Sequence, residues 1–382
     1  MRGIRPSTTA LWLAFEIVLC SGLWLAWASA GLAAAEPRIR VLLLEGQTAV
    51  VVSDARTAQP IARVSAAATK RLRVDGGPLV PRWRLTGHPG PVEVEGIPVR
   101  GEVEVIAISR PDGSTGLAVI NEVPLELYLA GTLAREMYAS WGAEALRAQA
   151  VASRTYALQQ RQAHHDELWH VSASTRSQVY AGIDAESPAV WAALAATRGE
   201  VLAYRGEPIL AVFHSSSGGR TASAEEVWGQ SRDYLVSVEV VDEWDSPDSY
   251  WRAPVSRTTL GRALASVAKD IGEIVRARVT ERSESGRATR IELVGENGTL
   301  SLGGRSLRSA LGESVLKSTL FELREEGEGF VFVGAGSGHG VGMSQWGARA
   351  MARRGDDYRE ILSSFYPGAT LTKTLRERGG TQ

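Results

Sequence analysis

The sequence predicts an α+β fold made of mixed β-sheets and short helices. Short runs rich in Val and Ile, broken by Gly and Pro, recur along the chain. Helical segments stand between these runs without a regular βαβ alternation, which argues against a doubly wound parallel sheet. No period of about 20–50 residues repeats, and this excludes a solenoid or a propeller.

The composition is that of an ordinary globular protein with one elaborate domain or two domains. The chain has 382 residues, of which 44% are hydrophobic and 22% are charged, and this length provides an ample core. The formal net charge of -1 argues against binding nucleic acid through a generally basic surface. A local basic groove stays compatible with this charge, but we predict no nucleic-acid partner.

Residues 1–35 have the pattern of an export signal peptide. Arg2 and Arg5 supply the charged start, residues 11–32 are largely apolar, and Ala33–Ala35 offers small residues for cleavage. The alternative is an uncleaved anchor, because residues 11–32 are long enough to span a membrane. Both interpretations place the body of the protein outside the cytoplasm, in the periplasm or the cell envelope.

The single cysteine, Cys20, lies inside this segment, so the exported chain has no thiol. Disulfides, thiolate nucleophiles and cysteine-based zinc sites are therefore excluded. His164, His165 and His170 could ligate a metal, but they lie in a polar stretch where solvated histidines are commoner. We predict neither a metal site nor a cofactor.

The chain after the signal is predicted to begin with strands. From Arg38 to Ile108, Val- and Ile-rich runs alternate with Gly and Pro, apart from an irregular connection at residues 78–91. A Pro-Asp-Gly turn follows at residues 111–113, and residues 116–120 form another strand. The role of the β-rich region 36–95 is not evident from its sequence.

Residues 131–161 form the central stretch of the chain. A short strand-like lead ends at residues 135–137, and a helix begins at about Glu144, so Glu136 lies near the mouth of that helix. Arg147 and Arg154 are seven residues apart and share one helix face. Most of the other helix positions are small and apolar, which favours burial against a sheet.

The remainder of the chain is predicted to alternate short helices and strands. The expected helices are residues 189–197, 256–270, 306–311 and a helix opened by the Gly-rich turn within residues 334–355. The expected strands are residues 200–204, 209–213, 277–281, 290–294 and 329–333. Residues 361–371 close the fold, and residues 372–382 form a polar tail.

Glu136 is the first candidate for chemistry. A carboxyl that acts as a general acid needs a raised pKa, and apolar neighbours such as Met137, Tyr138 and Trp141 would raise it. The alternative is a structural ion pair with Arg135 or with an arginine of the following helix.

Arg147 and Arg154 have two interpretations that the local sequence leaves open. They would bind an anionic or hydroxyl-rich substrate, or orient the glutamate. Alternatively, Arg154 makes a buried structural pair, a role that guanidinium groups do serve.

Two polar, Gly-rich segments remain. His214 and the Ser215–Ser217 run resemble a nucleophile loop, but G-x-S-x-G is absent, and a Ser–His pair would need distant partners such as His339. The alternative is a turn whose hydroxyls cap a helix or bind substrate hydroxyls. The Gly336–Gln345 segment lacks a phosphate-binding pattern, and its glycines allow close backbone approach around His339.

Together, these segments resemble the stage II sporulation protein D / amidase-enhancer (SpoIID/LytB domain) family. The resemblance rests on five blocks in the same order, at residues 122–158, 177–182, 213–229, 281–287 and 338–368. It implies a two-part α+β body around a substrate groove at residues 96–371, with residues 256–333 as a connecting α/β part. Sporulation members of the family are lytic transglycosylases that cleave peptidoglycan glycan strands lacking stem peptides.

The resemblance also implies roles for individual residues. The catalytic glutamate of the family matches Glu136, and its essential arginine matches Arg154. Further residues are expected to line the substrate groove, namely Arg147, Gln149, Ser215, Ser216, Ser217, His339 and Gln345. Three departures stand out: Tyr138 replaces a usual proline, Arg147 replaces a common lysine, and the Cys/His zinc cluster of some members is missing.

The implied activity needs only one carboxylate. The muramic C6 hydroxyl attacks the anomeric carbon, and one residue first protonates the leaving oxygen and then takes the hydroxyl proton. We therefore expect Glu136 to act on the MurNAc–GlcNAc bond of peptidoglycan and to leave 1,6-anhydro ends. The alternatives are a non-catalytic, peptidoglycan-binding enhancer of a cell-wall amidase, and a serine esterase that uses Ser217.

Overall fold

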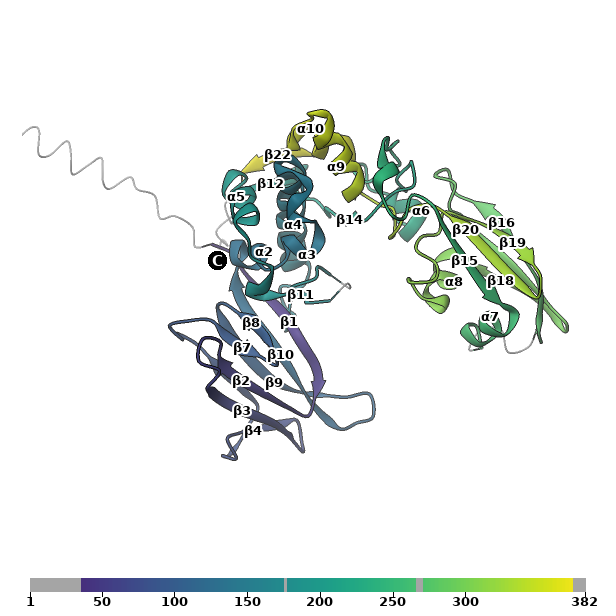
Figure 1. Ribbon diagram of the computed structural model, residues 1–382. Helices are drawn as coiled ribbons and strands as arrows, with labels where there is room; N and C mark the ends of the chain where they lie inside the picture. The colour runs from purple at the N-terminus through teal and green to yellow at the C-terminus, as the bar shows by residue number, and fades with distance from the viewer. Residues whose placement is uncertain (1–35, 175–176, 266–270, 374–382) are drawn as a thin grey trace, which may run out of the picture. The chain divides into compact units, whose positions relative to one another are not determined.

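The computed structural model describes residues 36–174, 177–265 and 271–373 (Figure 1). Mixed sheets and short helices follow a β-rich N-terminal region, so the predicted α+β class is confirmed. The expected signal or anchor at residues 1–35 lies outside the described residues. Within the described ranges, no helix has the length and apolarity that crossing a membrane requires.

The N-terminal region contains two sheets that share one hydrophobic core. The first has the strand order β5-β4-β3-β2-β7-β8, and its strands are β2 (Ala49–Asp54), β3 (Pro60–Ala67), β4 (Arg71–Val74), β5 (Leu79–Val80), β7 (Val92–Val94) and β8 (Ile97–Val99). The second has the order β11-β1-β10-β9-β6, and its strands are β1 (Arg38–Gln47), β6 (Arg82–Leu85), β9 (Glu102–Ser109), β10 (Thr115–Pro124) and β11 (Val171–Ser172).

One detail differs from the sequence-based expectation for this region. Residues 78–91 are not wholly irregular, because Leu85 pairs with Val103 and Leu72 pairs with Val80, which adds β6 and β5 to the sheets. In addition, β7 and β8 form a hairpin across residues 92–99. This hairpin lies within the range Arg38–Ile108 in which strands were expected.

Strand β10 connects this region to the helices. Its residues are buried on both faces: Leu117 and Val119 join the main core, while Ala118 and Ile120 pack in a second cluster with Trp169. A strand that is covered on both faces has apolar residues at consecutive positions. It leads directly into the first helix and so fixes where the central stretch begins.

The central stretch contains a turn and short helices before its long helix, and the strand-like lead predicted to end at residues 135–137 is wrong. Helix α2 (Leu125–Ala130) precedes it, and its own elements are α3 (Leu133–Glu136), η1 (Ala139–Trp141) and α4 (Ala143–Ala163). Leu125, Tyr128, Leu129 and Leu133 are all buried, and their spacing of three and four residues is that of a helix face. Gly142 has a φ of +102°, a conformation that favours glycine, and α4 begins at the next residue.

Helix α4 is confirmed, but other helices rather than a sheet cover most of it. It contacts α2, α5 (Pro188–Ala196), α9 (Gln345–Arg354) and α10 (Tyr358–Phe365), together with strand β12. These elements lie around α4 in Figure 1. Its many alanines allow the neighbouring helices to approach closely.

Short strands join the end of the chain to its middle. Strand β12 (Glu200–Tyr204) pairs with β13 (Glu207–Pro208) and with β22 (Thr370–Lys373), so the predicted tail begins inside a strand. Strand β14 (Phe213–His214) runs parallel to β21 (Met343–Ser344). Most of the strand expected at residues 209–213 is absent, because Ala211 and Val212 donate to carbonyls only two residues earlier.

The C-terminal part has a hydrophobic core of its own. Its two sheets have the orders β15-β20-β19 and β16-β17-β18, and its strands are β15 (Trp251–Ser256), β16 (Ile274–Arg282), β17 (Ala288–Gly295), β18 (Gly298–Gly303), β19 (Phe321–Glu326) and β20 (Gly329–Gly334). The predicted pair of strands is confirmed by the β16–β17 ladder. Helix α7 (Arg257–Ala263) covers the start of the helix expected at residues 256–270, of which residues 266–270 lie outside the described ranges.

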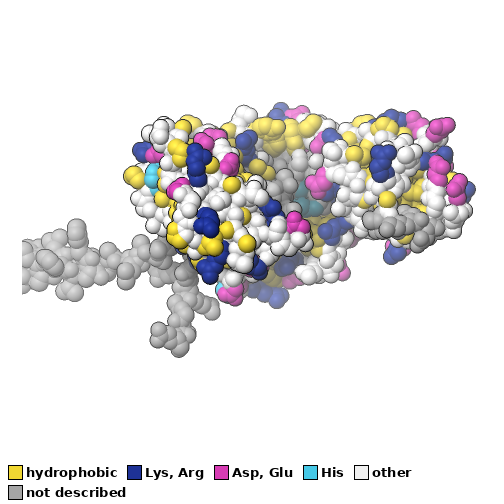
Figure 2. All heavy atoms as spheres, turned by 90° about the horizontal axis from the view of Figure 1, so that it is seen from below, with side chains coloured by type: hydrophobic (Ala, Val, Ile, Leu, Met, Phe, Trp, Pro, Cys, Tyr) yellow, Lys and Arg dark blue, Asp and Glu magenta, His cyan; other side chains and the backbone are white. Residues whose placement is uncertain are grey.

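Further short helical segments complete the described fold. They are α6 (Ala224–Trp228), α8 (Gly304–Leu311), which confirms the helix predicted at residues 306–311, and the single turn η3 (Glu243–Asp245). A similar turn, η2 (Gly182–Ala185), precedes α5. On the face shown in Figure 2, basic and acidic side chains are interspersed, in keeping with the net charge of -1.

A buried ion pair provides a test of this fold. Arg154 of α4 is 0% exposed and binds Glu126 of α2 through Nε–Oε1 and Nη2–Oε2 contacts of 2.7 and 2.9 Å. We expect Glu126→Ala to lower the free energy of unfolding by about 3–5 kcal/mol, because it leaves a buried guanidinium without its carboxylate. Chemical denaturation followed by circular dichroism measures this loss.

The matched control is Glu326→Ala, which breaks the exposed pair between Glu326 and Arg252. This variant should cost at most about 1 kcal/mol. A double replacement, Glu126→Leu with Arg154→Met, removes both charges and should recover part of the loss. Equal effects of Glu126→Ala and Glu326→Ala would show that the buried pair is not a structural constraint.

Candidate active site

Glu136 is the last residue of α3, and one of its oxygens is held by the chain that follows α4. Its Oε1 accepts a hydrogen bond of 2.7 Å from the backbone N–H of Val179. Among the described residues, its Oε2 has no hydrogen-bond partner, and Glu136 forms no ion pair with Arg135 or Arg147. One carboxylate oxygen is therefore positioned, and the other is free to meet a ligand.

Burial makes Glu136 an unusual carboxyl. The side chain is partly buried, and desolvation raises its pKa from 4.5 to about 7, although the Val179 hydrogen bond acts in the opposite direction. At neutral pH the protonated and ionised forms are thus present in similar amounts. Such a group can donate a proton and accept one at the same pH.

Tyrosines and the Gln178–Tyr180 segment form the surroundings of this carboxyl. Tyr128 donates to Gln178 Oε1 at 3.0 Å and stacks on Tyr180 with ring centroids 5.5 Å apart. Burial raises the pKa of Tyr128 and of Tyr156, and the negative charge of Glu136 adds to both shifts. Both tyrosines therefore remain neutral beside Glu136.

A glycine allows this packing. A Cβ on Gly131 would lie 2.5 Å from Cε2 of Tyr180, so no larger residue fits. The Tyr180 ring in turn donates its hydroxyl to Asn121 Oδ1 at 2.9 Å, which ties the wall of the site to strand β10. Sequence reasoning missed Tyr128, Tyr156 and Val179, although Val179 lies in the block at residues 177–182 that supports the resemblance.

Two aromatic side chains follow Glu136 closely. Tyr138 is 67% exposed, and its ring lies 5.4 Å from that of Trp141. Trp141 also contacts Trp346 of α9, with centroids 4.4 Å apart, and the guanidinium of Arg349 lies over both indole rings. The position where the family usually has proline therefore carries an exposed ring next to the candidate acid.

The two arginines singled out on α4 have different surroundings. Arg154 is fully buried; besides Glu126, it donates to the backbone oxygen of Glu200 at 3.2 Å. Arg147 is partly exposed and pairs with Glu144, and its Nε has no partner among the described residues. Neither guanidinium is hydrogen-bonded to Glu136. The structure thus places Arg154 in the buried pair that sequence reasoning had held as the alternative to a substrate contact.

Other predicted site residues meet between α4 and α9. Gln345 Nε2 donates to Gln149 Oε1 at 3.4 Å, and Gln149 donates to Ser153 at 3.1 Å. Both glutamines are buried, with exposed fractions of 8% and 0%. They join the two helices, while the backbone N–H of the adjacent Trp346 donates to the backbone oxygen of Ser215 at 3.0 Å.

The loop at residues 215–219, which we call the serine loop, is organised by a carboxylate that sequence reasoning missed. Glu243 of η3 is buried and accepts hydrogen bonds of 2.9–3.2 Å from the backbone N–H groups of Ser217, Gly218 and Gly219. It also accepts the hydroxyl of Ser344, the N-cap of α9. Glu243 therefore fixes both the loop and the start of α9. Its sequence signal is weak, since nothing around residue 243 marks it as buried.

A Ser–His pair is present but enclosed. Ser217 Oγ lies 2.9 Å from His214 Nε2, and His214 Nδ1 lies 3.1 Å from the carbonyl oxygen of Val341. Ser217 is 0% exposed and His214 is 4% exposed, and burial holds the pKa of His214 well below its ordinary value. A neutral imidazole between a hydroxyl and a carbonyl supports the loop, and the buried hydroxyl cannot reach a substrate. This geometry argues against the serine esterase.

His339 and the remaining serines complete the candidate residues. Ser216 is 2% exposed and pairs with Ser337 through two backbone hydrogen bonds, whereas Ser215 is partly exposed. The His339 ring lies 5.6 Å from that of His214 and 5.4 Å from Trp228. The serine loop and His339 thus lie together, Gln149 and Gln345 lie together, and Arg154 belongs to neither group.

No group of three or more His, Cys, Asp or Glu residues within the described ranges is arranged to hold a metal. His164 pairs with Glu167, and His165 pairs with Asp166, both in exposed positions. His170 receives the backbone N–H of Arg40 at 3.1 Å. The three histidines therefore have separate partners.

Comparison with known proteins identifies the family. Residues 113–204 match the family model described as stage II sporulation protein (SpoIID), and residues 241–342 match DUF8618, a domain of unknown function. A stage II sporulation protein D of Bacillus amyloliquefaciens is 30% identical over 70% of this chain and 79% of that protein. The chain belongs to the SpoIID family. The predicted resemblance is confirmed.

Two further relatives show the breadth of this family. An uncharacterized protein of Brachyspira hyodysenteriae is 35% identical over 67% of this chain and 68% of that protein. The amidase enhancer of Bacillus subtilis is 32% identical over 64% of this chain, but the match spans only 40% of its length. Glu136 and both α4 arginines lie within the SpoIID match, whereas Glu243 and His339 lie within the DUF8618 match.

The raised pKa of Glu136 predicts a characteristic titration. The folded carboxyl should lose its proton near pH 7, whereas the unfolded one does so near 4.5. The contribution of Glu136 to the free energy of unfolding is therefore greatest below about pH 4.5, and it is lost as the pH rises to about 7. Relative to wild type, the free energy of unfolding of Glu136→Gln should therefore increase by about 1–3 kcal/mol between pH 4.5 and pH 7. Denaturation at several pH values, with infrared difference spectra of the carboxyl band, measures both effects, and titration below pH 5 would contradict the burial argument.

Proposed function

We propose that this SpoIID-family protein is a peptidoglycan lytic transglycosylase that acts outside the cytoplasm on glycan strands without stem peptides. The observation that carries the proposal is the pKa of about 7 at Glu136, a carboxyl with one positioned oxygen. Membership of a family whose named members include stage II sporulation protein D supports a role at the cell wall.

In the proposed reaction, Glu136 acts twice. Protonated Glu136 gives its proton to the glycosidic oxygen of the MurNAc–GlcNAc bond as the bond from C1 to that oxygen breaks. The resulting carboxylate then takes the proton of the C6 hydroxyl while O6 forms a bond to C1. The carboxyl is thereby regenerated, no water is consumed, and the product is a 1,6-anhydro-muramic end.

The surroundings of Glu136 suit these two steps. The Val179 N–H fixes Oε1 and leaves Oε2 for the proton transfers. A hydrolase of the usual kind would add a second carboxylate close to the first, whereas a one-carboxylate mechanism has no such requirement. The exposed ring of Tyr138 offers a flat apolar surface on which the face of a sugar ring can pack.

Arg154 takes a positioning role in this proposal. It holds α2 against α4, and α2 leads directly into the short helix that ends at Glu136. Loss of this guanidinium would displace the acid without removing a substrate contact. An arginine can thus be required for activity although it never touches the glycan.

The central experiment is digestion of peptide-free glycan strands by the protein without residues 1–35. Glu136→Gln should reduce the formation of anhydro-muramic ends by about 10²–10⁴-fold, because the proton donor is lost. The wild-type rate should fall as the pH rises above about 7, since Glu136 must begin protonated. Mass spectrometry distinguishes anhydro ends, which are lighter by one water than hydrolytic ends.

The control is Glu167→Gln, which alters a glutamate whose side chain is 60% exposed and pairs with His164. It should leave the rate unchanged. If neither wild type nor Glu136→Gln produces anhydro ends, the transglycosylase proposal fails.

The second candidate function is enhancement of a cell-wall amidase, and the relative named amidase enhancer favours it. In that case the protein binds peptidoglycan without cleaving it and raises the rate of a partner enzyme. Wild type and Glu136→Gln should then stimulate a purified N-acetylmuramoyl amidase equally. Stimulation that depends on Glu136 would instead point to glycan cleavage.

A further inference from the structure

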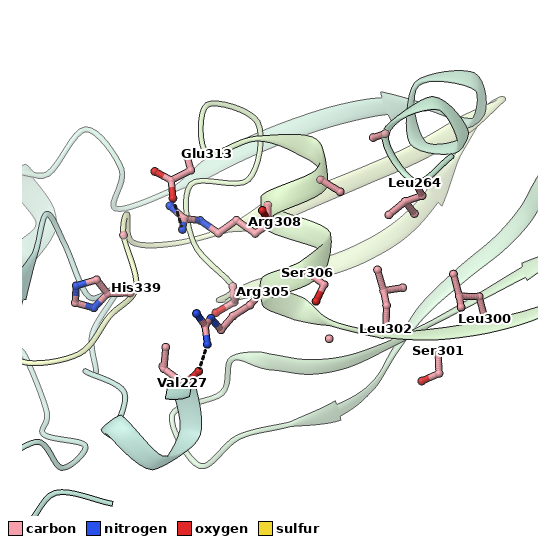
Figure 3. A pocket seen from close by; sticks show the side chains of 16 residues that line it. Val227, Leu264, Leu300, Ser301, Leu302, Arg305, Ser306, Arg308, Glu313 and His339 are labelled. Carbon is pink, nitrogen blue, oxygen red and sulfur yellow. Dashed lines mark hydrogen bonds and ion pairs between the residues drawn. The ribbon is translucent and has the colours of Figure 1, made fainter. Parts of the chain in front are cut away.

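The C-terminal part carries a groove of about 1060 Å³ that the proposed proton transfers do not use (Figure 3). Helix α8 and strand β18 supply one side, and the loop of His339 supplies another. We call it the arginine groove, after Arg305 and Arg308, which both line it. In Figure 3 the two guanidiniums extend from α8 in the direction of His339.

Arg305 has an exposed, incompletely occupied guanidinium. Its Nη1 donates to the backbone oxygen of Val227 at 2.5 Å, and it forms no ion pair with a described residue. Arg308 differs, since it donates to the carbonyl of Leu316 and pairs with Glu313 at 2.9 Å. Arg305 is therefore the cation of this groove that remains open to an anionic ligand.

A third arginine adds charge beside the groove. Arg287 is 3% exposed and lines a smaller cavity of about 120 Å³, which shares Arg305 and Thr319 with the arginine groove. Its Nη atoms donate to the carbonyls of Arg220 and Ser217, and its buried Nε has no partner among the described residues. Burial lowers the pKa of Arg287 only to about 10, so it remains charged.

The three charges act at one place. Burial is the main cause that lowers the pKa of His339 to about 4, and Arg308, Arg287 and Arg305 each lower it further. All three guanidiniums therefore raise the positive potential at His339, where the arginine groove reaches the serine loop. A protein with a net charge of -1 has here a local basic groove, a feature that its composition left open.

The other lining residues indicate what kind of anion fits. Leu300 and Leu302 provide apolar surface, and several hydroxyls lie among the cations, namely Ser301, Ser306, Ser309 and Thr319. A saccharide uses all three features, because its ring faces are apolar and its hydroxyls need partners. A simple phosphate polymer has no apolar ring face that could pack on the two leucines.

A peptide-free muramic residue carries such an anion. Its 3-O-lactyl group ends in a carboxyl that is amide-linked, and therefore neutral, while a stem peptide is attached. Hydrolysis of that amide leaves a free carboxylate. Guanidinium groups bind carboxylates through charge-assisted, often bidentate hydrogen bonds.

We propose that the arginine groove binds the peptide-free glycan strand and that Arg305 recognises the free lactyl carboxylate of a muramic residue. This inference rests on the proposed substrate. It explains how the protein selects such strands: intact strands offer no carboxylate at this position. An amide-cleaving reaction must consequently act on the strand first.

The test is a binding measurement in the Glu136→Gln background, so that no cleavage interferes. The probes are a muramic-acid-containing oligomer with free lactyl carboxylates, the same oligomer with these groups amidated, and a chitooligosaccharide of equal length. The free-carboxylate oligomer should bind most tightly, and its advantage should shrink with added salt. Arg305→Ala should weaken its binding by roughly three- to tenfold and abolish the preference, whereas Arg305→Lys should keep part of it.

The matched control is Arg276→Ala, which removes an exposed arginine of β16 outside the groove. It should leave binding unchanged, and both alanine variants should unfold at the wild-type temperature. Equal binding of the free and amidated oligomers, or a preference that survives Arg305→Ala, would overturn the inference. So would stronger competition by a glycerol-phosphate polymer than by the carboxylate oligomer.

These outcomes are separable from those of the catalytic proposal. Anhydro-end formation at equal rates on free and amidated strands would uphold the reaction and refute the role of Arg305. Carboxylate-dependent binding without any anhydro product would uphold the groove and refute the reaction.

Discussion

The buried pair between Arg154 and Glu126 is the interaction on which the site depends most. A fully buried guanidinium is tolerated only because its donors are taken up, by both oxygens of Glu126, by Thr197 and by the backbone of Glu200. These contacts join α2, α4 and the strand β12. Since α2 leads into α3 within a few residues, the position of Glu136 follows from a charge pair that no substrate reaches.

A second carboxylate, that of Glu243, joins the serine loop to the start of α9 in a comparable manner. Glu243 gathers three backbone N–H groups of the serine loop and the hydroxyl that caps α9. The same helix carries Gln345 and Trp346, which contact α4 and the aromatic rings after Glu136. Segments that are far apart in the sequence are thus joined by two carboxylates. One accepts hydrogen bonds from an arginine side chain of a helix, and the other accepts them mainly from the backbone of a loop.

The sequence alone was sufficient for the α+β class, the family and the long helix, because these depend on local patterns and on ordered blocks. It also singled out Glu136 as the candidate acid. It was insufficient for partners supplied from a distance. Glu126 precedes Arg154 by 28 residues and Val179 follows Glu136 by 43, and no periodicity links them. The segment before α4 was predicted to be extended because its helical pattern of apolar residues begins at Leu125 in α2, outside residues 131–161. Serine is usually an exposed residue type, yet Ser217 is buried, and its backbone N–H binds Glu243, which lies 26 residues later.

Comparison of three carboxyls shows how the surroundings of Glu136 differ from those of Glu126 and Glu243. Glu126 meets a guanidinium in a bidentate pair, and Glu243 accepts three N–H groups and a hydroxyl. The oxygens of both carboxylates are therefore occupied by donors from the protein itself. Glu136 has one N–H and no cation among the described residues, so desolvation outweighs hydrogen bonding and its pKa rises to about 7. The same type of side chain thus joins structural elements where several donors surround it, whereas at Glu136 a single donor leaves one oxygen for the proton transfers that we propose.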